Sequence, residues 1–252
     1  MGAINGEVVD GVFVLEIDRP PVNALDVETL NELAERLDKA VWEEQGPVVL
    51  TGSGPLFSAG ADLRRVLDSG PEYTNAGIVA LSQAFETLFV FPRPVVAAIN
   101  GHALAGGCIL ACACDYRIMA DSAGTIGTVE LRAGVPFPSW ALEIVRYAVG
   151  NQHLQEVVLT GRSYSPDEAL GKGLIDEVVP AGDLMARARA VASELAAAPA
   201  DTYRLTKRAL RKPAVEAAIK GAAATDEEVK AAWRSPEVHD AIKRLLASLG
   251  GG

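Results

Sequence analysis

Two short segments rich in small residues follow apolar runs and could place backbone N–H groups against an anion. They are FSAGADL at residues 57–63 and ALAGGC at residues 103–108. Small side chains let a ligand approach the backbone closely, and a helix N-terminus has free N–H groups and a partial positive charge. Taken alone, each segment also fits a tight turn or close helix–strand packing. Taken together, they predict a two-donor oxyanion hole.

A single carboxylate, Glu130, is the candidate base. It lies in IGTVEL at residues 126–131, shortly after the apolar run at 116–120. A carboxyl group beside apolar residues has a raised pKa and can act as a base near neutral pH. A solvated surface glutamate fits the same pattern, so this segment alone leaves both interpretations open.

The composition is that of a globular protein with a small ligand. The chain has 252 residues, a formal net charge of -10 and no run of Lys or Arg, so a nucleic-acid partner is not expected. The cysteines Cys108, Cys112 and Cys114 lack a zinc-like spacing with histidine and are expected to be buried thiols in a reducing compartment. We see no secretory signal and no apolar run long enough to span a membrane. A cytoplasmic protein without a metal site is expected.

Apolar periodicity predicts an α/β protein in which strand, loop and helix recur. Short apolar runs predict a hairpin at 7–18 and strands at 48–50, 95–99, 116–120 and 175–179. Apolar spacing typical of helices occurs at 27–44 (capped by Asp26), 72–89, 107–114, 138–149, 152–159, 183–198, 201–211 and 225–248. A Gly/Ser-rich loop is expected at 51–61.

Five motifs in register resemble the crotonase family, also called the enoyl-CoA hydratase/isomerase family. They are NAL (23–25), SAGADL (58–63), NGHALAGGC (100–108), CDYRIMAD (114–121) and IGTVEL (126–131). The similarity extends from about residue 5 to about residue 180. Each motif is weak alone, but the ordered set is highly specific.

The resemblance implies a fold and an assembly. The fold is a crotonase-like α/β spiral of ββα units with a helical C-terminal region. Residues 1–196 are expected to form the spiral core with the acyl-CoA site. Residues 197–252 are expected to form a helical oligomerisation region of a homotrimer or homohexamer.

The resemblance also implies roles for single residues. The N–H groups of Ala61 and Gly106 are the expected oxyanion donors, and Glu130 is the expected catalytic residue. The residues expected to border the coenzyme A (CoA) and pantetheine of the substrate are Ala24, Ala59, Asp62, Leu63, Arg64 and Leu104. The CoA belongs to the substrate, and no separate cofactor is implied.

One departure from the family pattern favours a particular reaction. Hydratases of this family have a second catalytic Glu directly after the Cys of the GGC-type motif, where this chain has Ile109. Hydration needs one carboxylate to activate water and another to help deliver the proton. A single carboxylate suffices to move a double bond, because it can take the C2 proton of a 3-enoyl thioester and return it at C4.

The leading prediction is therefore an isomerase of fatty-acid metabolism, since Δ3-Δ2-enoyl-CoA isomerases keep only the Glu that aligns with Glu130. Two alternatives stay open. One is an enoyl-CoA hydratase in which Glu130 works alone with water, and the other is a non-catalytic acyl-CoA-binding protein. His102 is the nearest residue in sequence that could replace the missing acid, although local hydrogen bonding explains a loop histidine equally well.

Further residues are expected around the substrate. Arg64 and Arg65 are hypothesised to hold the CoA phosphates, with solvated surface arginines as the alternative. The expected apolar walls of the acyl pocket, for which ordinary core packing is the alternative, are Val135, Pro136, Phe137 and Trp140.

Overall fold

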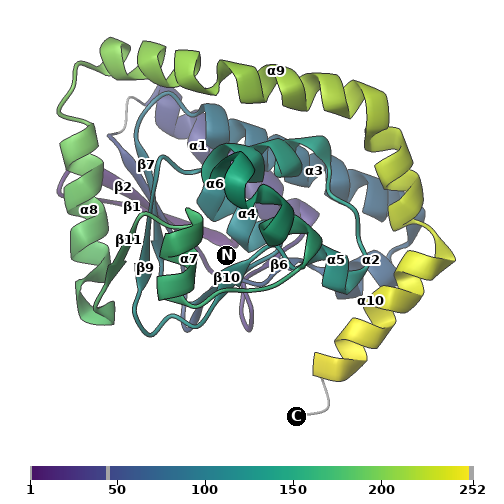
Figure 1. Cartoon of the computed structure of the whole chain (residues 1–252). Coiled ribbons are helices and arrows are strands. Elements are labelled where there is room, and N and C mark those ends of the chain that lie inside the picture. The colour runs from purple at the N-terminus through teal and green to yellow at the C-terminus, as the bar shows by residue number, and fades with distance from the viewer. Residues whose placement is uncertain (1, 44–45, 250–252) are drawn as a thin grey trace.

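The computed structural model describes residues 2–43 and 46–249, and its main sheet has six strands in the order β1-β2-β4-β7-β9-β11 (Figure 1). The first two strands form an antiparallel hairpin, and the other neighbours are parallel. The bounds are β1 Ile4–Val9, β2 Val12–Ile17, β4 Val48–Gly52, β7 Val95–Ile99, β9 Tyr116–Ala120 and β11 Glu177–Val179. The predicted hairpin and core strands are confirmed.

Local sequence explains these strands. The hairpin turns at Asp10 and Gly11, which both have positive φ (52° and 78°), as a two-residue hairpin turn requires. All residues of β4 and β7 are buried. Strands of a parallel sheet covered on both faces have such continuous apolar sequences.

Short strands outside the main sheet form two further small sheets, which complete a spiral. One sheet has the order β10-β8-β5 and another pairs β3 with β6. Their bounds are β3 Ala24–Leu25, β5 Leu56–Ser58, β6 Gly60–Ala61, β8 His102–Leu104 and β10 Ile126–Gly127. The prediction of a plain loop at 51–61 was therefore wrong, because β5 and β6 find partners in strands distant in sequence. The long strands β2, β7 and β9 each lead into one short strand and then a helix, which is a repeated ββα unit, and β4 leads into two short strands, β5 and β6, before α2.

Ten α-helices occur among the described residues, together with a 3-10 turn at Ala181–Asp183. Their bounds are α1 Val27–Trp42, α2 Leu63–Asp68, α3 Gly70–Val90, α4 Gly106–Ala113, α5 Glu130–Ala133, α6 Ser139–Leu159, α7 Pro166–Lys172, α8 Leu184–Leu195, α9 Ala200–Trp233 and α10 Pro236–Leu249. The predicted cap is confirmed, since the Asp26 carboxylate accepts a hydrogen bond from Thr29 N–H. Residue 44, the predicted end of the first helix, lies outside the described residues. The sequence did not predict α2, α5 or α7.

One predicted helix break is confirmed and one helix boundary differs from the prediction. A non-helical residue, Gly150 (φ 67°), separates the two predicted helices within α6. The predicted helices at 201–211 and 225–248 are instead α9, which continues for 34 residues through Pro213, and α10, which begins after Ser235. Proline removes one backbone hydrogen bond, but tertiary contacts hold α9 in the turns before it.

Those contacts form a buried charge cluster of Asp115, Lys207 and Arg211. Lys207 Nζ lies 2.7 Å from Asp115 Oδ2, and Arg211 Nη2 lies 2.8 Å from Asp115 Oδ1. Arg211 also donates to the carbonyls of Ala113 and Cys114 at the end of α4, at 3.0 and 3.1 Å. Buried charges need such partners. The charge cluster ties α9 to the core.

Apolar side chains gather in two clusters. The larger one fills the space between the sheets and helices and includes the three cysteines, which are buried as predicted. The smaller one, here called the second cluster, lies where α2, α3, α5, α9 and α10 meet (Figure 1). Its buried members are Val66, Ile78, Ala133, Val135, Trp233, Val238 and Ile242. The predicted division into a spiral core (1–196) and a helical oligomerisation region (197–252) stays a prediction. Residues of the helices after 197 belong to both apolar clusters.

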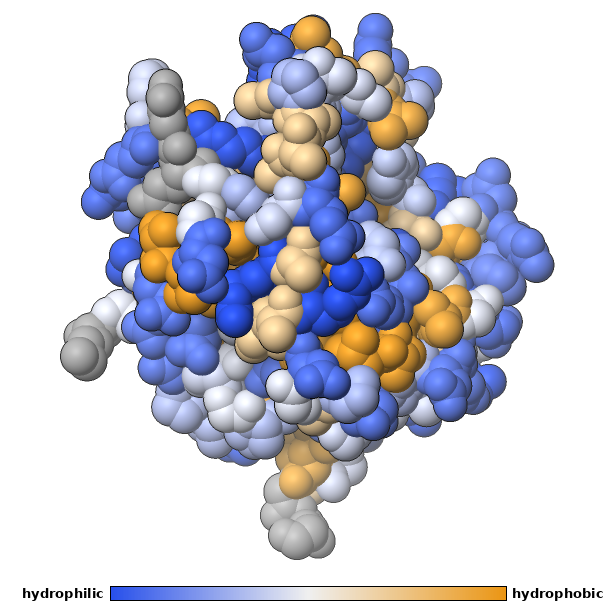
Figure 2. Space-filling model, turned by 90° about the vertical axis from the view of Figure 1, so that its left-hand side faces the viewer, coloured by the Kyte–Doolittle hydropathy of each residue, from blue (hydrophilic) through white to orange (hydrophobic). Residues whose placement is uncertain are grey.

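The surface is mainly polar on the face that carries α8 and the edge of the main sheet. Figure 2 shows hydrophilic side chains there, with apolar groups in separate patches. Among the helices of residues 2–43 and 46–249, none combines the length and apolarity needed to cross a bilayer.

Candidate active site

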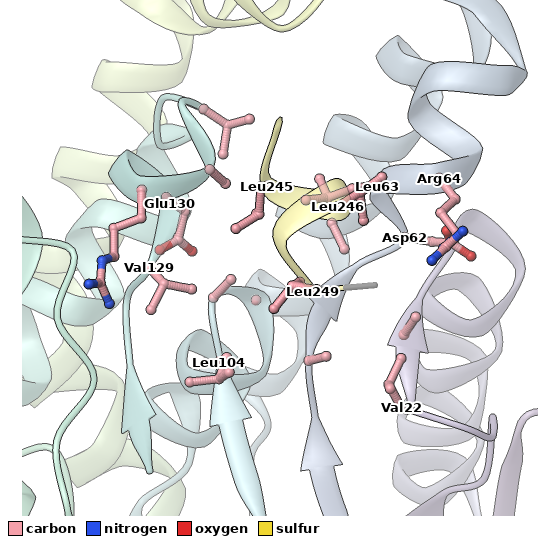
Figure 3. A pocket seen from close by; sticks show the side chains of 18 of the residues that line it. Val22, Asp62, Leu63, Arg64, Leu104, Val129, Glu130, Leu245, Leu246 and Leu249 are labelled. Atoms are coloured by element: carbon pink, nitrogen blue, oxygen red, sulfur yellow. The ribbon is translucent and has the colours of Figure 1, made fainter. Parts of the chain in front are cut away.

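A cavity of about 1000 Å3 brings the predicted site residues together. It opens between the small sheets and helices α2, α5 and α10. Figure 3 shows Glu130 on one side of it, Asp62 and Arg64 on the other, and leucines of α10 between them. All residues predicted for catalysis or substrate binding line this cavity, namely Ala24, Ala59, Ala61, Asp62, Leu63, Arg64, Leu104, Gly106 and Glu130.

The two glycine-containing segments are in direct contact. Gly60 has a φ of 86°, and a Cβ placed on it would lie 2.9 Å from Gly106 N. Only glycine therefore permits this approach. Ala105, just before α4, has a φ of 49°, which residues with a Cβ rarely adopt. Such strain persists where the surrounding structure imposes it, often at functional sites.

Hydrogen bonds hold each donor segment from behind. The Ser58 hydroxyl is buried, accepts from Gly60 N–H at 3.1 Å and donates to Asn23 O at 2.7 Å. Ala105 N–H donates to Gly127 O at 2.9 Å. Gly106 is the first residue of α4, so its N–H has no acceptor within the helix. This N–H is free to meet an oxyanion.

Glu130 is buried at the cavity wall, with 6% of its surface exposed. Its Oε2 atom has no hydrogen-bond partner among the described residues. Burial raises the pKa of this carboxyl to about 8, and the charge of a nearby Cys112 thiolate would act in the same direction, while a backbone hydrogen bond opposes it. The prediction of a buried carboxyl with a raised pKa is confirmed.

The other carboxylate of the cavity lining is already engaged. Asp62 Oδ1 accepts from Arg65 N–H and caps α2, and its Oδ2 lies 3.1 Å from the guanidinium of Arg19. Ile109, where the sequence resemblance implies that a second glutamate is missing, lines the cavity and is buried. Glu130 is therefore the one unpaired carboxylate in the described lining.

The two adjacent arginines have different surroundings. Arg64 lines the cavity, is exposed and has no ion pair within the described residues. Arg65 pairs with Asp26 and Glu28 at 3.0 and 2.6 Å, and its guanidinium lies 4.6 Å from the ring centre of Tyr73. Arg65 does not line the cavity. The structure therefore brings only Arg64 to the predicted site.

Two of the four residues predicted to form the pocket walls line the cavity. Val135 and Pro136 line the cavity, whereas Trp140 is buried in the larger apolar cluster and Phe137 packs against it. His102 is exposed on β8 and lies outside the lining, where its Nδ1 accepts from Thr125 N–H at 3.0 Å. This is the local hydrogen bonding that the sequence left open as an alternative to a catalytic role.

Several lining residues were not predicted. The C-terminal helix contributes Arg244, Leu245, Leu246 and Leu249, and α9 contributes Trp233. The apolar spacing of residues 201–211 and 225–248 indicated that these helices pack against another part of the protein or another subunit. It did not indicate which surface they cover. Arg132, beside the candidate base, also lines the cavity.

Comparisons with known proteins agree with the fold. A family model described as enoyl-CoA hydratase/isomerase matches residues 7–245. Mitochondrial enoyl-CoA delta isomerase 1 of Mus musculus is 35% identical over 213 residues, which cover 83% of this chain and 74% of the mouse protein. A putative enoyl-CoA hydratase of Thermus thermophilus is 39% identical over 166 residues, 65% of each chain. The crystal structure of human mitochondrial delta3-delta2-enoyl-CoA isomerase has a TM-score of 0.93 at 29% identity, with 98% of each chain covered.

Proposed function

This chain is an enzyme that belongs to the enoyl-CoA hydratase/isomerase family and has its crotonase fold, and from that premise we propose that it isomerises 3-enoyl-CoA to 2-enoyl-CoA. The observation that carries the proposal is the single unpaired carboxylate, Glu130, in a cavity where Ile109 takes the place of a second one.

The reaction begins with ionised Glu130 taking a proton from C2 of the 3-enoyl thioester. The electron pair moves onto the thioester oxygen, where the N–H groups of Ala61 and Gly106 stabilise the negative charge. The carboxylic acid then returns the proton at C4, and the double bond shifts to C2–C3. Atoms and charge balance without water, metal or redox cofactor. An apolar wall that bends the acyl chain lets one carboxylate reach both carbons.

The proposed oxyanion donors and base can together account for a rate enhancement typical of enzymes. One oxyanion donor contributes roughly 10²–10³ and a positioned base typically 10²–10⁴. Two donors and one base would give about 10⁶–10¹⁰ if their effects multiplied, which coupled groups rarely do. Orientation of the bound thioester adds to this.

We propose that the substrate's CoA and pantetheine lie along the side of the cavity opposite Glu130. Ala24 and Ala59 are the small contacts there, and Arg64 is the cation for a phosphate. Leu104, which lies on the Glu130 side in Figure 3, is the apolar contact at the thioester end of the pantetheine. Asp62 and Leu63 begin α2 and border the same channel. Hydration of 2-enoyl-CoA is the second candidate reaction, favoured by the similarity to a protein named as a hydratase.

The decisive experiment assays the purified protein on 3-enoyl-CoA and on 2-enoyl-CoA. Isomerisation by the wild type is expected, with a loss of roughly 10²–10⁴ in kcat for Glu130→Gln and unchanged CoA binding. Hydration without isomerisation would support the second candidate. No turnover of either substrate would leave an acyl-CoA-binding protein and refute both reactions.

We also propose that the chain assembles as a homotrimer or homohexamer. Helix α9 exposes Leu205, Leu210 and Ile219 by 45, 62 and 55%, and contact with other copies would bury such apolar side chains. Sedimentation at the mass of a 26.4 kDa monomer would contradict this. The cytoplasmic location expected from the sequence stays a prediction.

A further inference from the structure

The short helix that carries Glu130 has little conformational stability of its own. Helix α5 has four residues, begins at Glu130 itself and has no side-chain cap at Val129. It ends at Gly134, which has a φ of 77°. So short a helix has little stability alone. The direction of the Glu130 side chain therefore depends on what packs against this turn.

The corner between α9 and α10 packs against it closely. Trp233 Nε1–H donates to Pro136 O at 3.0 Å. A Cβ placed on Gly134 would lie 2.5 Å from the Cβ of Ala241, so α10 leaves no room at the end of α5. Ile242 is fully buried in the second cluster with Ala133 of the turn.

The second cluster also reaches the opposite wall of the cavity. It contains Val66 of α2, with half-buried Leu63 and Leu67 packed against it. Helix α2 follows the proposed oxyanion donor Ala61 directly. Ile242 does not line the cavity, so its influence on the site passes through its neighbours and not through contact with substrate. In Figure 3, α10 lies between the two walls.

We propose that Ile242 is a positioning residue. Together with Trp233 it clamps the Glu130 turn and, by seating α10, keeps water away from the Glu130 carboxyl. This inference rests on the proposed function of Glu130 as the base.

The charged and titratable groups around Glu130 agree with burial as the dominant influence. They are Arg132 on the same turn, Arg244 on α10, and Cys108 and Cys112 on α4. Both arginines are exposed and have no ion pair within the described residues. Loosening α10 would therefore hydrate the carboxyl and lower its pKa from about 8 toward its ordinary value of 4.5.

The test compares Ile242→Ala with Ile4→Ala in β1. Both isoleucines are almost fully buried, at 0% and 1% exposure, so the lost packing is similar, but Ile4 belongs to the larger apolar cluster and does not line the cavity. Two readouts are needed. One is kcat and KM for 3-enoyl-CoA. The other is titration of the protonated carboxyl band in the infrared spectrum, assigned by its loss in Glu130→Gln.

We expect Ile242→Ala to lower kcat by roughly tenfold to a hundredfold with little change in KM, and to move the Glu130 titration to lower pH. Ile4→Ala should lower thermal stability without either effect. If the two variants differ from the wild type only in stability, the positioning role is refuted.

A second variant covers the case in which Ile242→Ala does not fold. Trp233→Phe removes the hydrogen bond to Pro136 O and keeps an aromatic ring, and the same shift of the carboxyl titration is expected. An unchanged titration in a folded Trp233→Phe would also refute the inference. Because the titration needs no substrate, it tests the inference even if the wild type turns over neither enoyl-CoA, a result that would refute the proposed function instead.

Discussion

Burial of Glu130 controls both its reactivity and its effect on stability. The carboxyl has a pKa of about 8 in the folded protein because it is desolvated, against an ordinary value of 4.5. A base works best when its pKa lies near the working pH. The protonated form predominates at neutral pH, so only part of the free enzyme is ready to accept a proton.

This pKa predicts the pH dependence of the reaction. Because ionised Glu130 is the proposed base, kcat/KM for 3-enoyl-CoA should rise with pH and level off above about 8. Initial rates from pH 6 to pH 9 measure it. A flat profile over this range would contradict the assigned pKa of the base.

The same pKa predicts how stability changes with pH. The folded state holds the proton more tightly than the unfolded state, so the stabilisation is complete below pH 4.5 and is lost as the pH rises to about 8. Each pH unit in this window is worth at most about 1.4 kcal/mol. Glu130→Gln should therefore be more stable than the wild type at pH 9, as measured by urea unfolding. Equal stabilities at pH 9 would count against a buried, ionised Glu130.

Arg64 and Arg65 offer a matched pair for testing CoA binding. Arg64→Ala should weaken binding of CoA, measured by calorimetry, because Arg64 lines the side of the cavity proposed to hold the CoA and has no ion pair among the described residues. Arg65→Ala should leave this affinity unchanged, since its guanidinium already pairs with Asp26 and Glu28. Equal weakening by both substitutions would mean that phosphate recognition does not follow this geometry.

At the scale of elements, the site depends on very short ones. The strands β3 and β6 have two residues each and α5 has four. Sequence periodicity needs several residues to distinguish helix from strand, so none of these could be assigned from the pattern. The motifs nevertheless indicated the segments that line the cavity, because the small residues that permit a close backbone approach are adjacent in the sequence.

The contact between the two donor segments can be tested at Gly60. Gly60→Ala places a Cβ against Gly106 N and should separate the segments, with a loss in kcat of roughly 10²–10³. Gly54→Ala is the control, because Gly54 also has a positive φ (64°) but has open space around it. Its backbone strain should reduce stability by about 1 kcal/mol with kcat unchanged. A full kcat for Gly60→Ala would show that the close approach is unnecessary.

At the scale of the whole molecule, the C-terminal helices return to the candidate site, where α9 and α10 line the cavity. Helix α9 crosses the molecule above α3 and α6 and turns into α10 beside α2 and α5 (Figure 1). The buried cluster of Asp115, Lys207 and Arg211 fixes the first half of α9, and the second cluster receives its end.

Removing the shared carboxylate of this charge cluster should loosen α9. Asp115→Asn leaves Lys207 and Arg211 buried without their counter-charge, which is expected to lower the free energy of unfolding by about 3–5 kcal/mol. Asp240→Asn is the control, because its pair with Lys243 is exposed and should contribute at most about 1 kcal/mol. Urea unfolding of both variants measures the difference. Similar losses would mean that the charge cluster is not an anchor.

The sequence by itself determined the local parts of this protein. Apolar runs and turn residues set the core strands, Asp26 set the start of α1, and the ordered motifs identified the segments around Ala61, Gly106 and Glu130. These features depend on residues adjacent in the chain. They were sufficient to predict the family and the fold class, which the comparisons confirm.

Only the tertiary structure decided which of the candidates meet. It placed Arg64 at the cavity and paired Arg65 elsewhere, left Trp140 in the core, and brought Trp233 and α10 to the site. Burial and pairing depend on contacts between segments far apart in sequence, and no local pattern encodes them. The pKa of Glu130 follows from such contacts, so the proposal that it acts as the base depends on the folded chain.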